Sequence, residues 1–189
     1  MQEKVKEFQK ISGQPVGIGK LLDRDFRDNL LKEEVYELQE ALFNEDRVEI
    51  LDALCDIKYV NDGTANEMGV VLEGPSGYID KDADLLAMLK ECKVEEVDFV
   101  NSAVYELVKR CGFTMEQFNE GLNRVHESNM SKFCTDEPTA LETKEFYSNQ
   151  GISVVLEPRD KVIVVMRESD GKVLKSVKYH PVYLEDLCV

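Results

Sequence analysis

Two acidic stretches contain the residues of this chain whose types and spacing are best suited to chemistry. They are 30–42 (LLKEEVYELQEAL) and 48–61 (VEILDALCDIKYVN). Each has the apolar periodicity of an amphipathic helix, but carboxylates interrupt or border the apolar face. In the first stretch Glu34 falls inside the apolar stripe and Glu37 lies at its edge. In the second, one edge is occupied by three carboxylates: Glu49, Asp52 and Asp56.

Carboxylates in such positions need a partner, because removing their charge from water is costly. No comparable set of Lys or Arg lies on these two faces, and clustered carboxylate oxygens are the ligands that hard divalent cations prefer. The pattern therefore predicts a site for Mg²⁺ or Mn²⁺ formed by Glu34, Glu37, Glu49, Asp52 and Asp56. The alternative is that these residues form solvated faces of acidic helices. That alternative explains any single glutamate well, but it explains less well why carboxylates recur in such positions on two adjacent helical stretches.

The two stretches resemble the EExxE…ExxD signature of the all-α nucleoside triphosphate pyrophosphohydrolases. This superfamily includes MazG-like enzymes, dimeric dUTPases and phosphoribosyl-ATP pyrophosphohydrolase. The first half of the signature matches the segment 33–37 (EEVYE). The second half is either Glu49 with Asp52 or Asp52 with Asp56, because the spacer before Glu49 is slightly short for the family.

Later segments extend the resemblance towards the MazG-like branch. The segment 129–132 (NMSK) resembles the branch's late phosphate-binding motif. The segment 170–175 (DGKVLK), followed by Tyr179, resembles its tail. The resemblance covers most of the chain and is weaker over 71–94 and 150–168. Each motif is degenerate alone, but their combination in this order is fairly specific.

The resemblance implies an enzyme that hydrolyses a nucleoside triphosphate between its α and β phosphates. The products would be a nucleoside monophosphate and pyrophosphate, in a house-cleaning or nucleotide-pool role. Glu33 would orient or deprotonate the attacking water, with Mg²⁺ as cofactor. The polyphosphate would be bound by residues of the late segments: Asn129, Lys132, Lys172, Lys175 and Tyr179.

Three alternatives remain open. One is a phosphoribosyl-ATP pyrophosphohydrolase of histidine biosynthesis, although this chain is longer and has a different tail. Another is a non-catalytic interaction module with the same fold. The third, a carboxylate-bridged iron or manganese protein, would use Glu-x-x-His, and neither His126 nor His180 has a Glu three residues earlier. His126 lies one helical turn before Asn129 and could face the site, but a lone His is more often structural.

The composition limits the classes of molecule that this chain is expected to bind. The 189 residues carry a formal net charge of −15, which argues against nucleic acid and anionic membranes. A free nucleotide would also be repelled unless a metal ion inverted the local field. The five cysteines form no CxxC pair, and no run approaches the length of a membrane span. We therefore expect a cytoplasmic protein whose partners are a nucleoside triphosphate and further copies of itself, as a dimer or a dimer of dimers.

The expected fold is all-α, with a four-helix core and a small C-terminal β-hairpin. We expect a helical domain over 1–135 and a C-terminal extension over 136–189. A turn is predicted at 73–77 from its Gly and Pro residues. Strands are predicted at 152–156 and 162–166, with a turn at 157–161 between them. Helices are predicted at 1–11, 23–42, 48–68, 80–92, 94–111 and 114–128. A short helix is also predicted within 139–147.

Overall fold

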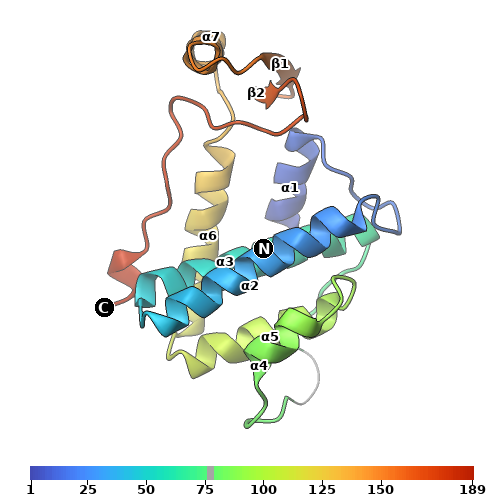
Figure 1. Cartoon of the computed structure of the whole chain (residues 1–189), viewed down its shortest axis with the longest axis vertical. Coiled ribbons are helices and arrows are strands. Elements are labelled where there is room, and N and C mark those ends of the chain that lie inside the picture. The colour runs from blue at the N-terminus through green and yellow to red at the C-terminus, as the bar shows by residue number, and fades with distance from the viewer. Residues whose placement is uncertain (76–78) are drawn as a thin grey trace.

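The computed structural model describes residues 1–75 and 79–189, and most of them are helical (Figure 1). A short 3₁₀-helix, η1 (Glu185–Leu187), lies near the C-terminus. The strands β1 (Val154–Arg159) and β2 (Val162–Arg167) form an antiparallel hairpin. Seven α-helices occur in these described ranges: α1 (Gln2–Ser12), α2 (Arg24–Phe43), α3 (Arg47–Met68), α4 (Leu85–Glu91), α5 (Val97–Arg110), α6 (Met115–Met130) and α7 (Glu137–Ser148). The expected all-α class with a C-terminal hairpin is confirmed.

Helix α3 is the central element of the core, because α1, α2, α5 and α6 all pack against it. Its Leu51 and Leu54 side chains are fully buried. The helix begins at Asp46, whose carboxylate accepts hydrogen bonds from the first backbone N–H groups, and ends at Gly69 in the left-handed conformation. A short turn separates α2 from α3, so the two helices lie side by side and antiparallel (Figure 1). This pair carries the acidic residues of the predicted site.

A buried ion pair joins the start of α2 to the end of α3. The Arg27 Nε lies 2.8 Å from a Glu67 carboxylate oxygen, and the two side chains are 5% and 2% exposed. The other Glu67 oxygen accepts a hydrogen bond from the Leu22 backbone N–H at 2.7 Å. The pair therefore fixes both the relative position of the two helices and the loop that leads into α2.

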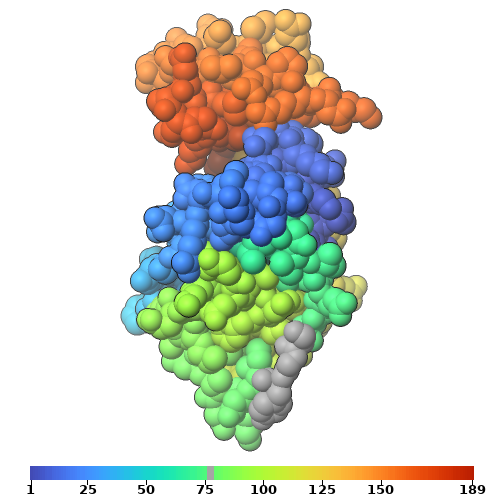
Figure 2. Space-filling view, turned by 90° about the vertical axis from the view of Figure 1, so that its right-hand side faces the viewer, coloured from blue at the N-terminus to red at the C-terminus, as the bar shows by residue number. Residues whose placement is uncertain are grey.

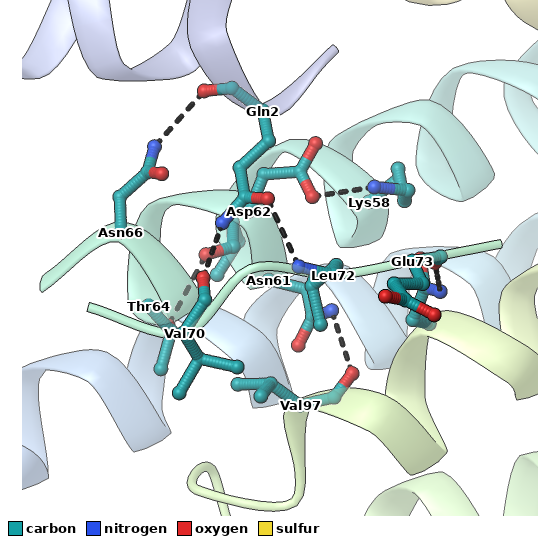
Figure 3. A network of polar contacts seen from close by, with 12 residues as sticks. Gln2, Lys58, Asn61, Asp62, Thr64, Asn66, Val70, Leu72, Glu73 and Val97 are labelled. Atoms are coloured by element: carbon teal, nitrogen blue, oxygen red, sulfur yellow. Dashed lines mark hydrogen bonds and ion pairs between the residues drawn. The ribbon is translucent and has the colours of Figure 1, made fainter. Parts of the chain in front are cut away.

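A second polar network links α3 to α1 and α5 (Figure 3). Lys58 donates to Asp62 at 2.5 Å, and both side chains are buried. Asn66 donates to the backbone oxygen of Gln2 at 3.0 Å. Asn61 donates at 3.0 Å to a backbone carbonyl at the start of α5. The sequence analysis did not identify either buried ion pair, Arg27 with Glu67 or Lys58 with Asp62.

The C-terminal residues form a second hydrophobic cluster around Cys134, Ala140, Val165 and Leu174. In the space-filling view this part lies above the first helices (Figure 2). Arg159 attaches it to the end of α1 by donating to the Ile11 carbonyl at 2.9 Å.

Gly13 leaves room for this attachment. A Cβ at that position would lie only 2.2 Å from Arg159 Nη1, and the Gly13 φ of +79° also disfavours other residues. The contact between hairpin and α1 therefore depends on a glycine at the helix end.

The last residues return along α6 to the helical core (Figure 1). Leu184 is 1% exposed within the main hydrophobic cluster. Arg124 pairs with Asp186 at 2.5 Å, and Gln117 donates to the Leu187 carbonyl at 2.7 Å. The C-terminal residues thus contact both hydrophobic clusters, and the domain boundary between 135 and 136 stays a prediction.

Two predicted elements differ from the structure. Helix α4 begins only at Leu85 rather than at residue 80, because the Asp84 carboxylate caps it by accepting from the Ala87 N–H at 3.0 Å. The hairpin turn is also tighter than expected, since β1 continues to Arg159 and leaves Asp160 at the turn, with φ of +52°.

Other expectations can be compared only in part. The predicted capping box of Thr114 and Gln117 at the start of α6 is present. The predicted turn at 73–77 extends into residues 76 and 77, which lie outside the described residues. Among the helices of the described ranges, none combines the length and apolar character that crossing a membrane would require.

We expect Arg27→Leu to lower the free energy of unfolding by about 3–5 kcal/mol, because the buried Glu67 carboxylate would lose its partner. Arg24→Leu is the matched control. Arg24 also lies in the first turn of α2 and contacts Glu95 at 2.8 Å, but the two side chains are 55% and 37% exposed. Its loss should cost less than about 1 kcal/mol. Urea denaturation of both variants measures this difference, and equal losses would contradict the assignment.

Candidate functional site

A cavity of about 720 Å³ lies where α1, α2 and α3 meet the end of α6 and the turn after β2. Glu34 of α2 and Asp56 of α3 both line it. Antiparallel packing brings these two carboxylates together, although 22 positions separate them in the sequence. The rest of the wall includes residues from the other elements: Phe8, Gln9, Arg27, Leu30, Tyr59, Asn129, Lys132, Asp170, Gly171 and Lys172.

The carboxylates of the site repel one another. Burial, followed by repulsion from Glu37, Glu33 and Asp52, raises the pKa of the Glu34 carboxyl to about 7. Burial, followed by repulsion from Glu49 and Glu37, raises the pKa of Asp52 to about 6. Both shifts favour the neutral acid, because the surroundings offer too little positive charge to stabilise the anion.

The remaining carboxylates belong to the same electrostatic group. Burial raises the pKa of Asp56 well above its usual value, and Asp52 and Glu34 add to this effect, whereas Lys132 opposes it. Burial and neighbouring glutamates also raise the pKa of Glu37. The structure therefore places the predicted acidic residues within range of one another's charge.

Their side chains do not converge on one point. Among the described residues, no group of three or more His, Cys, Asp or Glu is arranged closely enough to hold a metal ion. Glu33, Glu37 and Glu49 are exposed, whereas Asp52 is half-buried and its Oδ1 has no hydrogen-bond partner. A buried oxygen without a partner is costly. The acidic residues therefore lack enough positive charge nearby to compensate them, and Asp52 Oδ1 lacks a hydrogen-bond donor.

The cavity is also lined by basic residues, Lys132 and Lys172. Lys132 donates to Asn129 Oδ1 at 2.5 Å, and its ammonium lies 5.9 Å from the centre of the Phe8 ring. Burial lowers the pKa of Lys132, and the nearby Asp56 charge opposes that shift. Lys172, from the turn after β2, lines the same cavity. The predicted phosphate-binding residues Asn129, Lys132 and Lys172 therefore line the same cavity as Glu34 and Asp56.

Two other predicted phosphate-binding residues, Lys175 and Tyr179, are not among the described residues that line the cavity. The Lys175 ammonium is 4.3 Å from the centre of the Tyr179 ring. The Tyr179 hydroxyl accepts from Ser128 Oγ at 3.3 Å. Lys175 is still near enough for its charge to lower the pKa of Lys132. Lys175 and Tyr179 are therefore placed to support the basic residues of the cavity, not to line it themselves.

Sequence analysis raised His126 as a residue that could face the site, but it did not connect His126 with Tyr59. The Tyr59 hydroxyl lies 3.1 Å from His126 Nδ1, and both residues are buried. Tyr59 follows Asp56 by one turn of α3, and His126 precedes Asn129 by one turn of α6. This spacing was visible in the sequence, but only the packed helices show that the two side chains meet.

The arrangement suits a ligand that carries both a divalent cation and a polyphosphate. Carboxylates of α2 and α3 can coordinate the cation, and the lysines across the cavity can neutralise phosphate oxygens. Neither group alone would suffice, because the acidic side repels a free anion. The cavity is also large enough for a small organic ligand.

Two comparisons with known proteins found similarity to this chain. Residues 5–83 match the family model of phosphoribosyl-ATP pyrophosphohydrolase. The chain is also 31% identical to the uncharacterized protein L479 of Acanthamoeba polyphaga mimivirus, over 226 aligned positions that cover 91% of this chain and 89% of that protein. No solved structure matches the chain. The matched family consists of pyrophosphohydrolases, which release pyrophosphate by hydrolysis and typically depend on a divalent metal. The chain therefore belongs to the MazG-like all-α nucleoside triphosphate pyrophosphohydrolase superfamily, with the phosphoribosyl-ATP pyrophosphohydrolases as its matching family.

Proposed function

We propose that this protein is a Mg²⁺-dependent nucleoside triphosphate pyrophosphohydrolase. It cleaves its substrate between the α and β phosphates and releases a nucleoside monophosphate and pyrophosphate. One observation carries the proposal: Glu34 and Asp56 line the same cavity as Lys132 and Lys172. The family supports pyrophosphohydrolase chemistry in general, and the position of cleavage and the substrate class are our proposal.

The acidic residues fit a divalent cation in their chemistry. Glu34, Glu37, Asp52 and Asp56 would hold it, with Glu49 as a further ligand if the second pair of the signature begins there. The unpartnered Asp52 Oδ1 and the raised carboxyl pKa values both indicate a missing positive charge. When bound, the cation supplies charge neutralisation for the phosphates and a lowered pKa for water.

The other residues would bind and orient the reactants. Glu33 is exposed beside Glu34 and would accept a proton from the attacking water. Asn129 and Lys132 would hold the polyphosphate from the end of α6, and Lys172 would contact it from the hairpin side. Lys175 and Tyr179 would support this basic side from behind. The roles of Asn129, Lys132 and Lys172 are supported by their place in the cavity lining, whereas the role of Glu33 rests on the family resemblance.

A second candidate is phosphoribosyl-ATP as the substrate, and the family model that matches residues 5–83 favours it. It would use the same residues and the same bond cleavage. A homo-oligomeric state and a cytoplasmic location stay predictions.

We expect the pure protein to release pyrophosphate from one or a few substrates in a panel of ribo- and deoxynucleoside triphosphates and phosphoribosyl-ATP. Activity should need Mg²⁺ and disappear with chelator. Asp56→Asn should lower kcat by at least about 100-fold, because a ligand of the charge-stabilising cation is lost. Coupled assays that measure pyrophosphate and orthophosphate separately determine which product is released, with and without Mg²⁺ and in the variant.

Glu40→Gln is the control for this panel, because Glu40 lies on the exposed side of the same helix as Glu34. It should retain the activity of the wild type. Orthophosphate without pyrophosphate would place the cleavage at a different bond. No turnover of any substrate, with Mg²⁺ binding retained, would favour the non-catalytic module instead.

Lys172→Met should raise KM by about tenfold and change kcat little, because a charge-assisted contact to the polyphosphate is lost. Steady-state kinetics with the best substrate of the panel measures the two parameters. Lys109→Met, at an exposed position on α5, should leave both unchanged. A loss confined to kcat would assign Lys172 to the chemical step rather than to binding.

The stability of the metal-free protein should fall as pH rises. The folded-state pKa of Glu34 is raised from 4.5 to about 7, so the native state binds more protons than the unfolded state between these values. Asp52 acts in the same direction between 3.8 and about 6. Glu34→Gln should therefore flatten the decline over this window and stabilise the protein at pH 8. Urea denaturation with chelator, from pH 4 to 8, measures the slope.

Glu142→Gln on the exposed side of α7 serves as the control for this titration and should follow the wild-type curve. A Glu34→Gln curve parallel to the wild type would show that Glu34 ionises in the folded protein at its ordinary pKa.

A further inference from the structure

We propose that His126 and Tyr59 are positioning residues that act through Asn129 to hold the Lys132 ammonium at the basic side of the cavity. The consequence for catalysis rests on the proposed pyrophosphohydrolase function, whereas the hydrogen-bonded relay itself does not. Neither residue belongs to the acidic signature of the family, and His126 is not in the cavity lining among the described residues.

The relay runs through four side chains from α6, α3 and the residues after α6. His126 Nδ1 lies 3.1 Å from the Tyr59 hydroxyl. Tyr59 and Asn129 line the same cavity, and Asn129 lies close enough to the Tyr59 hydroxyl to act against the rise in the tyrosine pKa that burial and Asp56 cause. Asn129 Oδ1 then accepts from Lys132 Nζ at 2.5 Å. The chain of contacts therefore leads from a buried imidazole to the ammonium that faces the cavity.

The donors and acceptors determine the direction of every bond in this relay. An ammonium can only donate, so the atom of Asn129 facing Lys132 must be its carbonyl oxygen. The amide nitrogen of Asn129 is then left to donate to the Tyr59 oxygen. The Tyr59 hydrogen must in turn point to His126 Nδ1, which accepts it in the tautomer that carries the proton on Nε2.

Burial supports this neutral form of the imidazole. His126 is 7% exposed, and burial, followed by the Lys4 charge, lowers its pKa, whereas Glu7 and Glu127 oppose that shift. The His126 and Tyr59 rings stack with their centres 6.1 Å apart. Burial and stacking therefore hold His126, the end of the relay outside the cavity lining, in place.

The aromatic residues around Tyr59 limit its movement. Phe8 packs edge-on against Tyr59 at 6.1 Å and lies 5.3 Å from the Phe133 ring. The Lys132 ammonium lies over the same Phe8 ring. A phenol in this setting has few alternative positions, so its hydroxyl can orient Asn129 reliably.

Lys132 needs such a restraint because opposing charges act on it. Asp56 and Glu34 attract its ammonium, whereas Lys172 and Lys175 repel it. Without the bond to Asn129, the ammonium would be free to pair with the acidic residues that the cation requires. The relay therefore keeps the basic and acidic sides of the cavity apart.

The test uses three substitutions in the full chain. Tyr59→Phe removes the hydroxyl with almost no change of shape, and His126→Leu removes the acceptor. His126→Asn places an amide oxygen close to the position of Nδ1 and should preserve the relay. Tyr105→Phe is the control, because it removes a hydroxyl from a tyrosine that packs against Phe118 elsewhere in the core.

The first readout is the NMR signal of the Lys132 side chain in protein labelled with ¹³C-lysine, assigned with Lys132→Met. Tyr59→Phe and His126→Leu should shift this signal in the same way. His126→Asn and Tyr105→Phe should leave it near the wild-type position. An unchanged Lys132 signal in Tyr59→Phe would overturn the proposal, even if His126→Leu failed to fold.

The second readout is kinetic and uses the best substrate of the turnover panel with Mg²⁺. KM should rise about tenfold in Tyr59→Phe and in His126→Leu, as expected for one lost hydrogen bond in the relay, with kcat changed little. The double variant should lose no more than either single one, because both break one chain of contacts. A merely destabilised enzyme would instead lower kcat at constant KM, and that result or additive losses would overturn the proposal.

The two readouts separate this proposal from the function on which it depends. If no substrate of the panel is hydrolysed, the proposed function fails, but the Lys132 signal still decides whether the relay exists. If turnover is found and the signal does not respond to Tyr59→Phe, the relay fails alone.

Discussion

Repulsion between carboxylates held on two packed antiparallel helices is the constraint on which the rest of this structure depends. Glu34 and Asp56 face one cavity, and burial raises the pKa of both carboxyl groups. Such an arrangement opposes folding unless other interactions offset it. The apolar core around α3, with Leu51 and Leu54 fully buried, supplies that compensation. The acidic residues therefore lie on two helices whose apolar faces form the core, and burial of those faces offsets the repulsion.

The positive charges that face these carboxylates come from distant parts of the chain. Lys132 follows α6, and Lys172 lies on the turn after β2. They reach the cavity because the second hydrophobic cluster holds the hairpin above the helices, and because Arg159 binds the end of α1. The C-terminal part is thus more than an appendage, since one wall of the cavity consists of its residues. The buried pair of Arg27 and Glu67 joins the start of α2 to the end of α3, and Arg27 also lines the cavity.

Much of the fold could be predicted from local patterns. Apolar residues at helical spacing indicated the positions of the main helices, and the capping box at Thr114 indicated the start of α6, because both signals depend on neighbours within one turn. Helix α4 was predicted too long, since the apolar pattern did not show that the Asp84 cap would delay its start. The hairpin turn was misplaced for a related reason. Pro158 suggested a turn, but the residue lies within β1, opposite Ile163.

The sequence by itself determined which residue types could form the site, because carboxylates on an apolar helix face and a late Asn–Lys segment are visible without coordinates. It could not determine which of them meet. Only the tertiary structure decided that Glu34 and Asp56 share a cavity with Lys132 and Lys172, whereas Lys175 and Tyr179 lie beside it. It also decided that Tyr59 meets His126. The physical reason is that helical periodicity specifies the face on which a side chain lies, whereas contacts between elements far apart in the sequence depend on how the whole core packs.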